Sequence, residues 1–328
     1  MNDKTILVTG GTGSFGRKFT QVIFKKFKPK KLIVFSRDEF KQSEMSKEFP
    51  EKKYPIRYFL GDIRDRSRLF RAFEGVDYVI HAAALKQVPA LEYNPMEAVK
   101  TNILGADNIV EASIDVGVKK VIALSTDKAV NPVNLYGATK LVAEKTFVAA
   151  NAYAGGRVKF SVVRYGNVVG SRGSVIPLFL NFKKQGIKEF PITDEKMTRF
   201  WITLEEGVDL VLKALENTVG GETFVPMIPS MKVTDLALAI EPKCTFKKIG
   251  IRPGEKIHET LVSEDEARKT KIFKGSYVIM PQFYENEDVH KVYDKFPFVP
   301  ENFVYCSDKN EKWLTIKDLQ KVIKSDSL

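Results

Sequence analysis

Residues with reactive side chains lie close together in the stretch STDKAVNPVNLYGATK, Ser125–Lys140. Tyr136 and Lys140 are four positions apart, so on a helix they share one face. A lysine near a tyrosine favours the phenolate and can also hold a nicotinamide ribose. The tyrosine can then take a hydroxyl proton while hydride leaves the same carbon. Asp127 and Lys128 precede this pair, which raises the question of what a lysine beside an aspartate adds to the chemistry.

A second pattern with chemical meaning is the glycine loop TGGTGSFG at Thr9–Gly16. Gly10, Gly13 and Gly16 are spaced by three, between an apolar strand-like run and a helix-like run. Glycines permit a tight turn and a close approach of a pyrophosphate, whose charge the helix N-terminus meets. Tight turns also need glycine, but the strand before the loop and the helix after it favour dinucleotide binding.

The end of the second strand-like run indicates which dinucleotide is bound. An acidic residue there would accept hydrogen bonds from the adenosine ribose, but Ser36 and Arg37 occupy the place. A hydroxyl and a guanidinium suit a 2′-phosphate, so we expect NADP. Alternatively, Arg37 pairs with a surface carboxylate such as Glu39. We expect Asp62 near the adenine and residues 81–86 along the cofactor.

The glycine loop and the reactive side chains must be positioned by regular elements. The pattern of the first half of the chain predicts a parallel sheet covered on both faces. Apolar runs alternate with helix-like segments, which together indicate an α/β, doubly wound (Rossmann) fold. The runs read as strands are TILVTG, KLIVFS, IRYFLGD, VDYVIHAAA, KVIALST and KFSVVRYGNV. The segments read as helices are 15–27, a charged helix from Glu39, 66–73, 95–116 and a helix from about Tyr136.

The pattern changes after about Gly170, where prolines break the chain into short elements. We therefore expect a cofactor-binding domain at 1–170 and, mainly from 171–328, a smaller α/β substrate-binding region whose elements interleave with the first. The run ETFVP could return to the large sheet as a further strand. Beyond Ser263 the pattern predicts little.

Composition narrows the function classes. The net charge of +11 comes from 52 basic and 41 acidic residues, which suits an anionic partner of some kind. No nucleic-acid signature accompanies it, so a nucleic-acid binder rests on charge alone. No apolar run suits a membrane helix, no export signal is evident, and the two cysteines fit no metal spacing. We expect a cytoplasmic protein with no metal, membrane or nucleic-acid partner.

The chain resembles the extended short-chain dehydrogenases/reductases that modify nucleotide sugars. Within them, the Asp-Lys pair and the motifs SRDEFKQSEM, IHAAALKQVPALEYNP, VVRYGNVVGSRGSV, PITDEKMTRFWIT and IGIRPGEKIHE resemble the inverting UDP-N-acetylglucosamine 4,6-dehydratases, over residues 3–262. Retaining dehydratases usually carry Asp-Glu where this chain has Asp127-Lys128. Gln87 departs from the histidine expected there. The resemblance implies pseudaminic acid synthesis, tightly bound NADP recycled within one cycle, and a homo-oligomer, with a hexamer as one form.

The resemblance also makes the lysine intelligible. Oxidation at C4 acidifies the hydrogen on C5, water leaves from C5 and C6, and hydride returns to C6. Tyr136 is expected to deprotonate the 4-hydroxyl, and Lys128 the C5 position. Lys128 needs a pKa lowered by burial or positive charge. Asp127, kept neutral, would protonate the departing C6 hydroxyl. Alternatively, Asp127 and Lys128 form only a structural ion pair.

The remaining expectations concern binding. Arg252 in RPGEK is the main candidate for the UDP diphosphate and Glu255 for the uridine ribose, although Pro-Gly is also turn chemistry. Arg199 is a second possible phosphate ligand or a salt-bridge partner. The expected cofactor-binding residues are Gly10, Thr12, Gly13, Ser14, Phe15, Gly16, Ser36, Arg37, Lys41, Asp62, Ile63, Ala82, Ala83, Ala84, Lys86, Thr101, Asn102, Ser125, Tyr136, Lys140, Val168, Val169, Gly170, Ser171 and Arg172. The expected substrate-binding residues are Lys86, Thr126, Lys128, Asn167, Val175, Thr193, Arg252 and Glu255.

Three alternatives stay open. A UDP-sugar 4-epimerase needs the same tyrosine and cofactor but no base for C5. A retaining 4,6-dehydratase would form the keto sugar without inverting C5. A non-catalytic nucleotide-binding sensor would not need Tyr136 and Lys140, and both are present.

Overall fold

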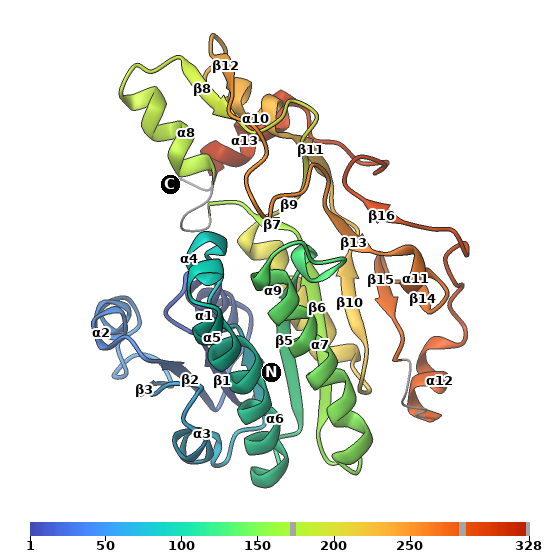
Figure 1. The fold of residues 1–328 in the computed structure, drawn as a ribbon. Helices are drawn as coiled ribbons and strands as arrows, with labels where there is room; N and C mark the ends of the chain where they lie inside the picture. Colours follow the sequence, from blue (N-terminus) through green and yellow to red (C-terminus); the bar gives the residue numbers. More distant parts are fainter. Residues whose placement is uncertain (171–174, 282–286, 326–328) are drawn as a thin grey trace.

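The computed structural model describes residues 1–170, 175–281 and 287–325, which form a large lobe below a smaller one (Figure 1). The strands of the large sheet are β1 (Thr5–Thr9), β2 (Lys31–Ser36), β3 (Ile56–Leu60), β4 (Tyr78–His81), β5 (Lys120–Thr126), β6 (Lys159–Tyr165), β10 (Thr223–Pro226), β14 (Thr270–Phe273) and β15 (Ser276–Ile279). Their order is β14-β15-β10-β6-β5-β4-β1-β2-β3. The pairs from β10 through β3 are parallel, and β15 pairs antiparallel with both β10 and β14. The sheet is therefore the predicted doubly wound α/β type.

Helices cover both faces of this sheet because the apolar side chains of its strands alternate in direction. In β1, Ile6 and Val8 join one buried cluster with side chains of α1 and α9, whereas Leu7 joins another with side chains of α3, α6 and α7. The helices of this lobe are α1 (Ser14–Lys26), α2 (Glu39–Glu48), α3 (Arg66–Phe73), α4 (Val88–Tyr93), α5 (Pro95–Ala98), the π-helical η1 (Val99–Leu104), α6 (Gly105–Val116), the 3-10 turn η2 (Asp127–Ala129), α7 (Leu135–Tyr153), α9 (Leu204–Asn217), α11 (Glu264–Ala267) and α12 (Glu287–Tyr293).

Most of the elements expected from sequence are present, with two differences. The helix expected at 95–116 is divided into α5, η1 and α6, and it ends at Gly117, whose φ of 81° is left-handed. The chain beyond Ser263, where the sequence pattern predicted no clear elements, forms the β14–β15 hairpin, which extends the large sheet. The strand expected from ETFVP is confirmed as β10, parallel to β6.

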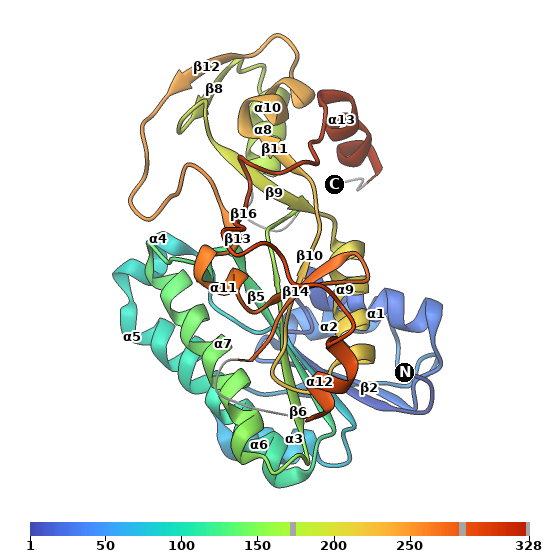
Figure 2. The same ribbon diagram turned by 90° about the vertical axis from the view of Figure 1, so that its right-hand side faces the viewer.

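The smaller lobe has its own apolar core. Its elements are β7 (Asn167–Val168), α8 (Val175–Lys184), β8 (Glu189–Ile192), β9 (Thr198–Ile202), β11 (Ser230–Lys232), α10 (Val233–Ile240), β12 (Thr245–Lys248) and α13 (Ile316–Ser325), and the pair β13 (Thr260–Val262) and β16 (Tyr305–Cys306) lies nearer the large sheet (Figure 2). Phe179, Phe190, Trp201 and Leu236 pack together in this core. The smaller lobe is therefore stabilised by an apolar core separate from those of the large sheet.

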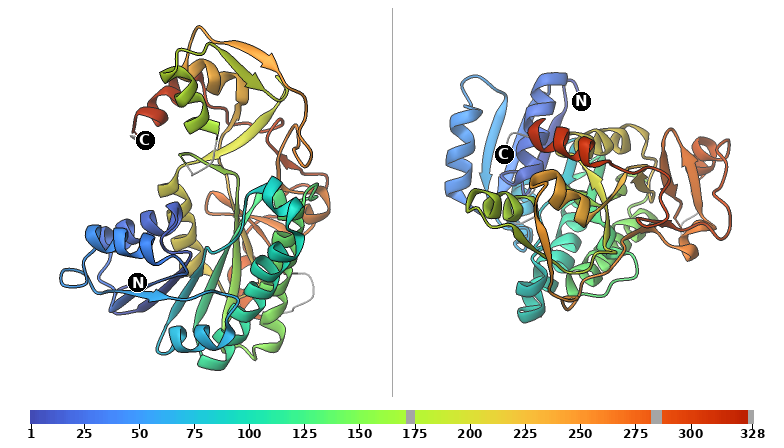
Figure 3. Two further views of the ribbon diagram at one scale, coloured as in Figure 1. Left: turned by 60° about the vertical axis from the view of Figure 1, so that its left-hand side comes forward. Right: turned by 90° about the horizontal axis from the view of Figure 1, so that it is seen from above.

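The chain crosses between the lobes more than once. After β9 it returns to the large sheet for α9 and β10, and it returns again for β14 and β15, which lie at the opposite end of the sheet from β3 (Figure 3). A domain boundary near residue 170 stays a prediction. Among the helices of the described residues, none has the length and apolar character to cross a membrane.

Candidate functional site

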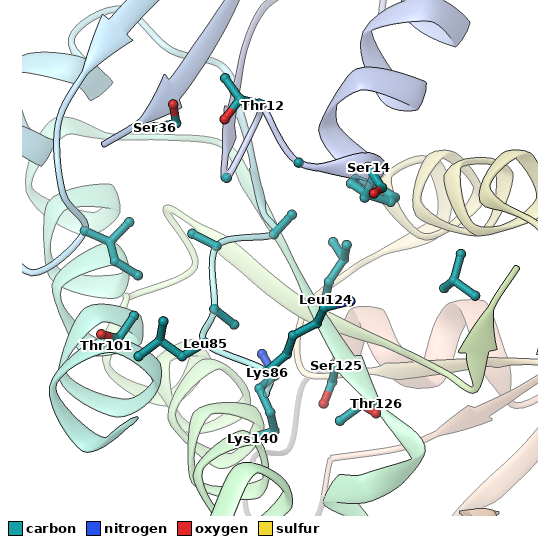
Figure 4. A pocket seen from close by; sticks show the side chains of 18 of the residues that line it. Thr12, Ser14, Ser36, Leu85, Lys86, Thr101, Leu124, Ser125, Thr126 and Lys140 are labelled. Carbon is teal, nitrogen blue, oxygen red and sulfur yellow. The ribbon is translucent and has the colours of Figure 1, made fainter. Parts of the chain in front are cut away.

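A cavity of about 760 Å³ lies along the carboxyl ends of the parallel strands, where open α/β sheets bind their ligands. Lys86, Ser125, Thr126 and Lys140 lie at one end of it, and Ser36 lies toward the other (Figure 4). The expected residues that line it are Gly10, Thr12, Gly13, Ser14, Phe15, Ser36, Arg37, Lys41, Asp62, Ile63, Ala82, Ala83, Ala84, Lys86, Thr101, Ser125, Thr126, Lys128, Tyr136, Lys140, Asn167 and Val168.

The glycine loop between β1 and α1 fits a dinucleotide. Gly10 has a left-handed φ of 64°, and a Cβ there would lie 2.9 Å from the Ala83 backbone, so a side chain is excluded. Gly13 is the N-cap of α1, so the free backbone N–H groups of the first helical turn begin at the cavity wall. The Ser125 and Thr101 hydroxyl oxygens are buried without a hydrogen-bond partner in the described chain. A bound dinucleotide could satisfy such groups.

The end of the cavity near Ser36 carries two acids that are already paired with cations. Asp62 lies 2.7 Å from Arg64 and 3.6 Å from Arg37. Asp38, which the sequence reasoning did not single out, caps α2 through the Lys41 backbone N–H and pairs with the Lys41 ammonium at 2.6 Å. Because both carboxylates are neutralised, this end presents a mixed surface with net cationic character to a ligand.

Tyr136 and Lys140 lie on α7, whose first turn is fixed by the Asn134 side chain accepting the Gly137 backbone N–H at 2.8 Å. Burial raises the pKa of Tyr136 to about 12, although Lys128 acts in the opposite direction. Burial lowers the pKa of Lys140 to about 8, against the effect of Glu144. In the ligand-free protein Tyr136 is therefore a phenol at neutral pH.

Asp127 and Lys128 form η2 at the end of β5. Asp127 is fully buried, and its Oδ1 accepts hydrogen bonds from the Thr126 hydroxyl at 2.7 Å and the Lys128 ammonium at 3.1 Å. Burial alone would lower the pKa of Lys128, but the charges of Asp127 and Glu259 outweigh it and the pKa is raised. The sequence argument required a lowered pKa, and it did not foresee two carboxylates beside one ammonium.

Sequence reasoning missed Glu259 and left two roles open for Arg199, a phosphate ligand or a salt-bridge partner. Glu259 is buried, with Oε1 3.6 Å from the Arg199 Nε and 3.9 Å from the Lys128 Nζ. Arg199 also donates to the backbone oxygens of Thr198, Ile257 and Lys256. Its guanidinium therefore serves the protein itself, as the salt-bridge alternative proposed. A final glutamate in the motif IGIRPGEKIHE was the available signal for Glu259.

The structure brings together three of the substrate-binding residues expected from the smaller lobe. The Thr193 hydroxyl donates to Glu255 at 3.2 Å, and Arg252 lies 4.0 Å from the same carboxylate with an exposed side chain. Gly254, between them, accepts a hydrogen bond from the Asn134 side chain at 2.7 Å. This loop is therefore attached directly to the N-terminus of α7.

Several expected residues do not line the cavity. Asn102 is buried and bonds both the N–H and the carbonyl of Leu85, so it holds the 82–86 loop from behind. Gly16 is buried in α1 against Gly11. The others away from the cavity wall are Asp127, Val169, Gly170, Val175, Thr193, Arg252 and Glu255. Ser171 and Arg172 lie outside the described residues. Gln87 lines the cavity.

Comparison with known proteins places these features in a family. The sequence profile described as "Polysaccharide biosynthesis protein" matches residues 6–281. A UDP-N-acetylglucosamine 4,6-dehydratase (inverting) from Campylobacter jejuni subsp. jejuni serotype O:2 is 53% identical, covering 98% of each chain. A UDP-glucose 4-epimerase from Rickettsia massiliae is 46% identical over 84% of this chain and 83% of its own. The crystal structure of Pen from Bacillus thuringiensis superposes with a TM-score of 0.89 at 37% identity, covering 99% of this chain and 98% of that one.

Proposed function

The chain belongs to the polysaccharide biosynthesis protein family and, within it, to the inverting UDP-N-acetylglucosamine 4,6-dehydratases, and we propose that it carries out their reaction. The substrate is UDP-N-acetylglucosamine and the product is UDP-2-acetamido-2,6-dideoxy-β-L-arabino-hex-4-ulose. The observation that supports this reaction over the other sugar-nucleotide reactions is Lys128, which lines the same cavity as Tyr136 and is hydrogen-bonded to the buried Asp127.

The chain's own residues divide the proton transfers among them. Tyr136 takes the proton of the 4-hydroxyl, Lys128 takes the proton of C5, and Asp127 gives a proton to the departing C6 hydroxyl. Reprotonation of C5 from the opposite face, by a proton derived from solvent, inverts that carbon. A bound nicotinamide cofactor supplies the hydride acceptor for C4 and the hydride donor for C6.

The cofactor that these residues suit is NADP. The glycine loop would hold the pyrophosphate, and Lys140 and Ser125 would hold the nicotinamide ribose. Ser36, Arg37 and Lys41 line the adenosine end, where the nearby Asp62 and Asp38 are paired with cations. This arrangement supports a 2′-phosphate more than a free ribose hydroxyl.

The wider setting is also a proposal. A hydro-lyase acting on a UDP-sugar fits a cytoplasmic protein in the first step of pseudaminic acid synthesis. The apolar side chains exposed on the described surface of α7 and its neighbours support a homo-oligomer, for which a hexamer is one possibility. Arg252 would bind the diphosphate, and Glu255 and Thr193 the uridine.

The reaction is tested by NMR of the purified protein with UDP-N-acetylglucosamine in deuterated water. We expect a 6-deoxy-4-keto sugar with deuterium at C5 and the L-arabino configuration. The same ketone with C5 retained would remove the proposed role of Lys128 in inversion. A sugar inverted at C4 with no deuterium at C5 would favour the epimerase alternative, which the Rickettsia relative represents.

A further inference from the structure

Glu259 is a buried carboxylate to which the reaction described above gives no role. Its exposed fraction is 3%, and its Oε2 has no hydrogen-bond partner among the described residues. Its Oε1 faces two cations, Arg199 at 3.6 Å and Lys128 at 3.9 Å. A buried charged group is costly unless it is paired, so a carboxylate left half-satisfied beside a reacting lysine requires an explanation.

The backbone of Glu259 is held firmly in this place. Its N–H donates to the Ser307 hydroxyl at 2.9 Å, and its carbonyl accepts the Ser307 N–H at 2.8 Å. The residues before Glu259 also bond to the segment between β5 and α7, at two points. The Asn134 side chain donates to the Gly254 carbonyl, and the Lys256 ammonium donates to the Val130 carbonyl. The segment from Arg252 to Glu259 is therefore docked against the residues that follow β5.

We propose that Glu259 is a positioning residue for the elimination step, holding the Lys128 amine between two carboxylates so that it can leave Asp127 and approach C5 of the sugar. This inference rests on the proposed function. With Asp127 alone beside it, the ammonium would settle into a closed ion pair. Neither the acid nor the base would then be free to meet the substrate. The Glu259 carboxylate supplies a second attraction for the Lys128 ammonium.

The charges around Glu259 are consistent with this role. Burial first, and then Asp127, raises the pKa of Glu259, whereas Lys128, Arg199 and Lys256 act in the opposite direction. Glu259 attracts the Lys128 ammonium as a carboxylate, and the proton that Lys128 must lose before it acts as a base can pass to Asp127, its hydrogen-bond partner, which then holds it as the acid. The segment proposed to bind UDP therefore also carries Glu259, the carboxylate that positions Lys128.

The test uses the cofactor-loaded protein, UDP-N-acetylglucosamine and the variants Glu259→Gln and Glu259→Asp. For Glu259→Gln we expect kcat to fall about 100-fold with KM nearly unchanged. The near-ultraviolet absorbance of reduced nicotinamide should rise during turnover, because oxidation at C4 continues while elimination is slow. Glu259→Asp keeps the carboxylate and should recover part of kcat and lose the absorbance.

Glu266→Gln is the matched control, since Glu266 pairs with the buried Arg164 at 2.9 Å, away from the cavity. It should lower the Tm and leave kcat and the absorbance unchanged. Wild-type kcat in Glu259→Gln would overturn the proposal. So would a fall in kcat and Tm with no reduced cofactor, which would mean a structural role only. If the wild-type protein formed no keto sugar, the proposed function would fail instead.

Discussion

Tyr136 and Lys140 are one helical turn apart, but burial moves their pKa values in opposite directions. The pKa of Tyr136 rises to about 12 and that of Lys140 falls to about 8. At neutral pH the tyrosine thus keeps its proton, and the lysine is mostly protonated but loses its proton more easily than an exposed lysine does. A further positive charge near the phenol lowers its pKa. The proposed role of Tyr136 as a base therefore requires a lower pKa in the ligand-bound protein than in the free one.

Arg37 carries the clearest prediction at the residue scale. Arg37→Ala removes the guanidinium proposed to bind the 2′-phosphate, and a charge-assisted hydrogen bond contributes about 1.5–3 kcal/mol. We expect the Kd for NADP⁺ to rise roughly ten- to hundredfold and the Kd for NAD⁺ to change little, measured by isothermal titration calorimetry. Arg57→Ala is the control, because Arg57 is similarly exposed and pairs with Glu51. Equal losses for both dinucleotides would contradict the NADP assignment.

Single-residue reasoning from sequence could predict much of the cofactor cavity. The glycine loop, Ser36 and the Tyr-Lys pair lie next to strand ends, and strand ends can be read from apolar runs. Glu259 could not be predicted in this way, because it reaches Lys128 only through the docking of the two lobes. Arg199 was equally ambiguous, since its partners are backbone carbonyls that no sequence pattern marks.

Among the elements, the loop from Arg252 to Glu255 depends on close contact with α7. Gly254 has a left-handed φ of 78°, and a Cβ there would lie 2.9 Å from the Asn134 Cβ. Gly254→Ala should therefore break the hydrogen bond to Asn134 and raise the KM for UDP-N-acetylglucosamine up to about tenfold. Gly250→Ala is the matched control, with a φ of 82° and open space around it. Steady-state kinetics should show an unchanged KM for the control, and an equal effect would refute the contact argument.

The β1–β4 pair carries a prediction about pH. His81 is buried beside Thr9, and burial first, then Lys140, lowers its pKa to about 3. Between pH 6.5 and about 3 the unfolded chain binds a proton that the native one does not, so acidification lowers the free energy of unfolding. By about pH 4 the loss is roughly 3 kcal/mol.

Chemical denaturation at several pH values should show this loss reduced in His81→Asn. His290→Asn, which alters an exposed histidine, should keep the wild-type dependence. If His81→Asn lost stability with acid as steeply as the wild type, His81 would not be the titrating group.

Element prediction failed where the chain departs from regular periodicity. The run 95–116 has one continuous helical pattern, but a π-helical segment, η1, interrupts the helix. The spacing of the apolar residues does not change there, so the interruption could not be predicted. The strands β14 and β15 are four residues each, too short for their alternation to stand out from a loop. The long parallel strands were predictable because burial on both faces makes them continuously apolar.

At the scale of the whole molecule, the exposed apolar side chains on one set of helices predict self-association. They are Tyr93, Met96, Leu104, Val142 and Tyr153, together with Val133 in the loop before α7. Leu104 and Val142 are 50% and 43% exposed in the single chain. We expect light scattering to give a multiple of the 37.1 kDa chain mass, and the double variant Leu104→Glu, Val142→Glu to lower it. Ile187→Glu, in the other lobe, should leave the mass unchanged, and a monomeric wild type would contradict the prediction.

The position of β10 beside β6 has a consequence for how the protein is made on the ribosome. When β6 emerges, its outer edge has no partner, since β10 follows only after much of the smaller lobe has been translated. An unpaired apolar strand edge is a site for aggregation with other nascent chains. Between the synthesis of Tyr165 and Thr223 this edge of the nascent sheet is therefore open to such pairing.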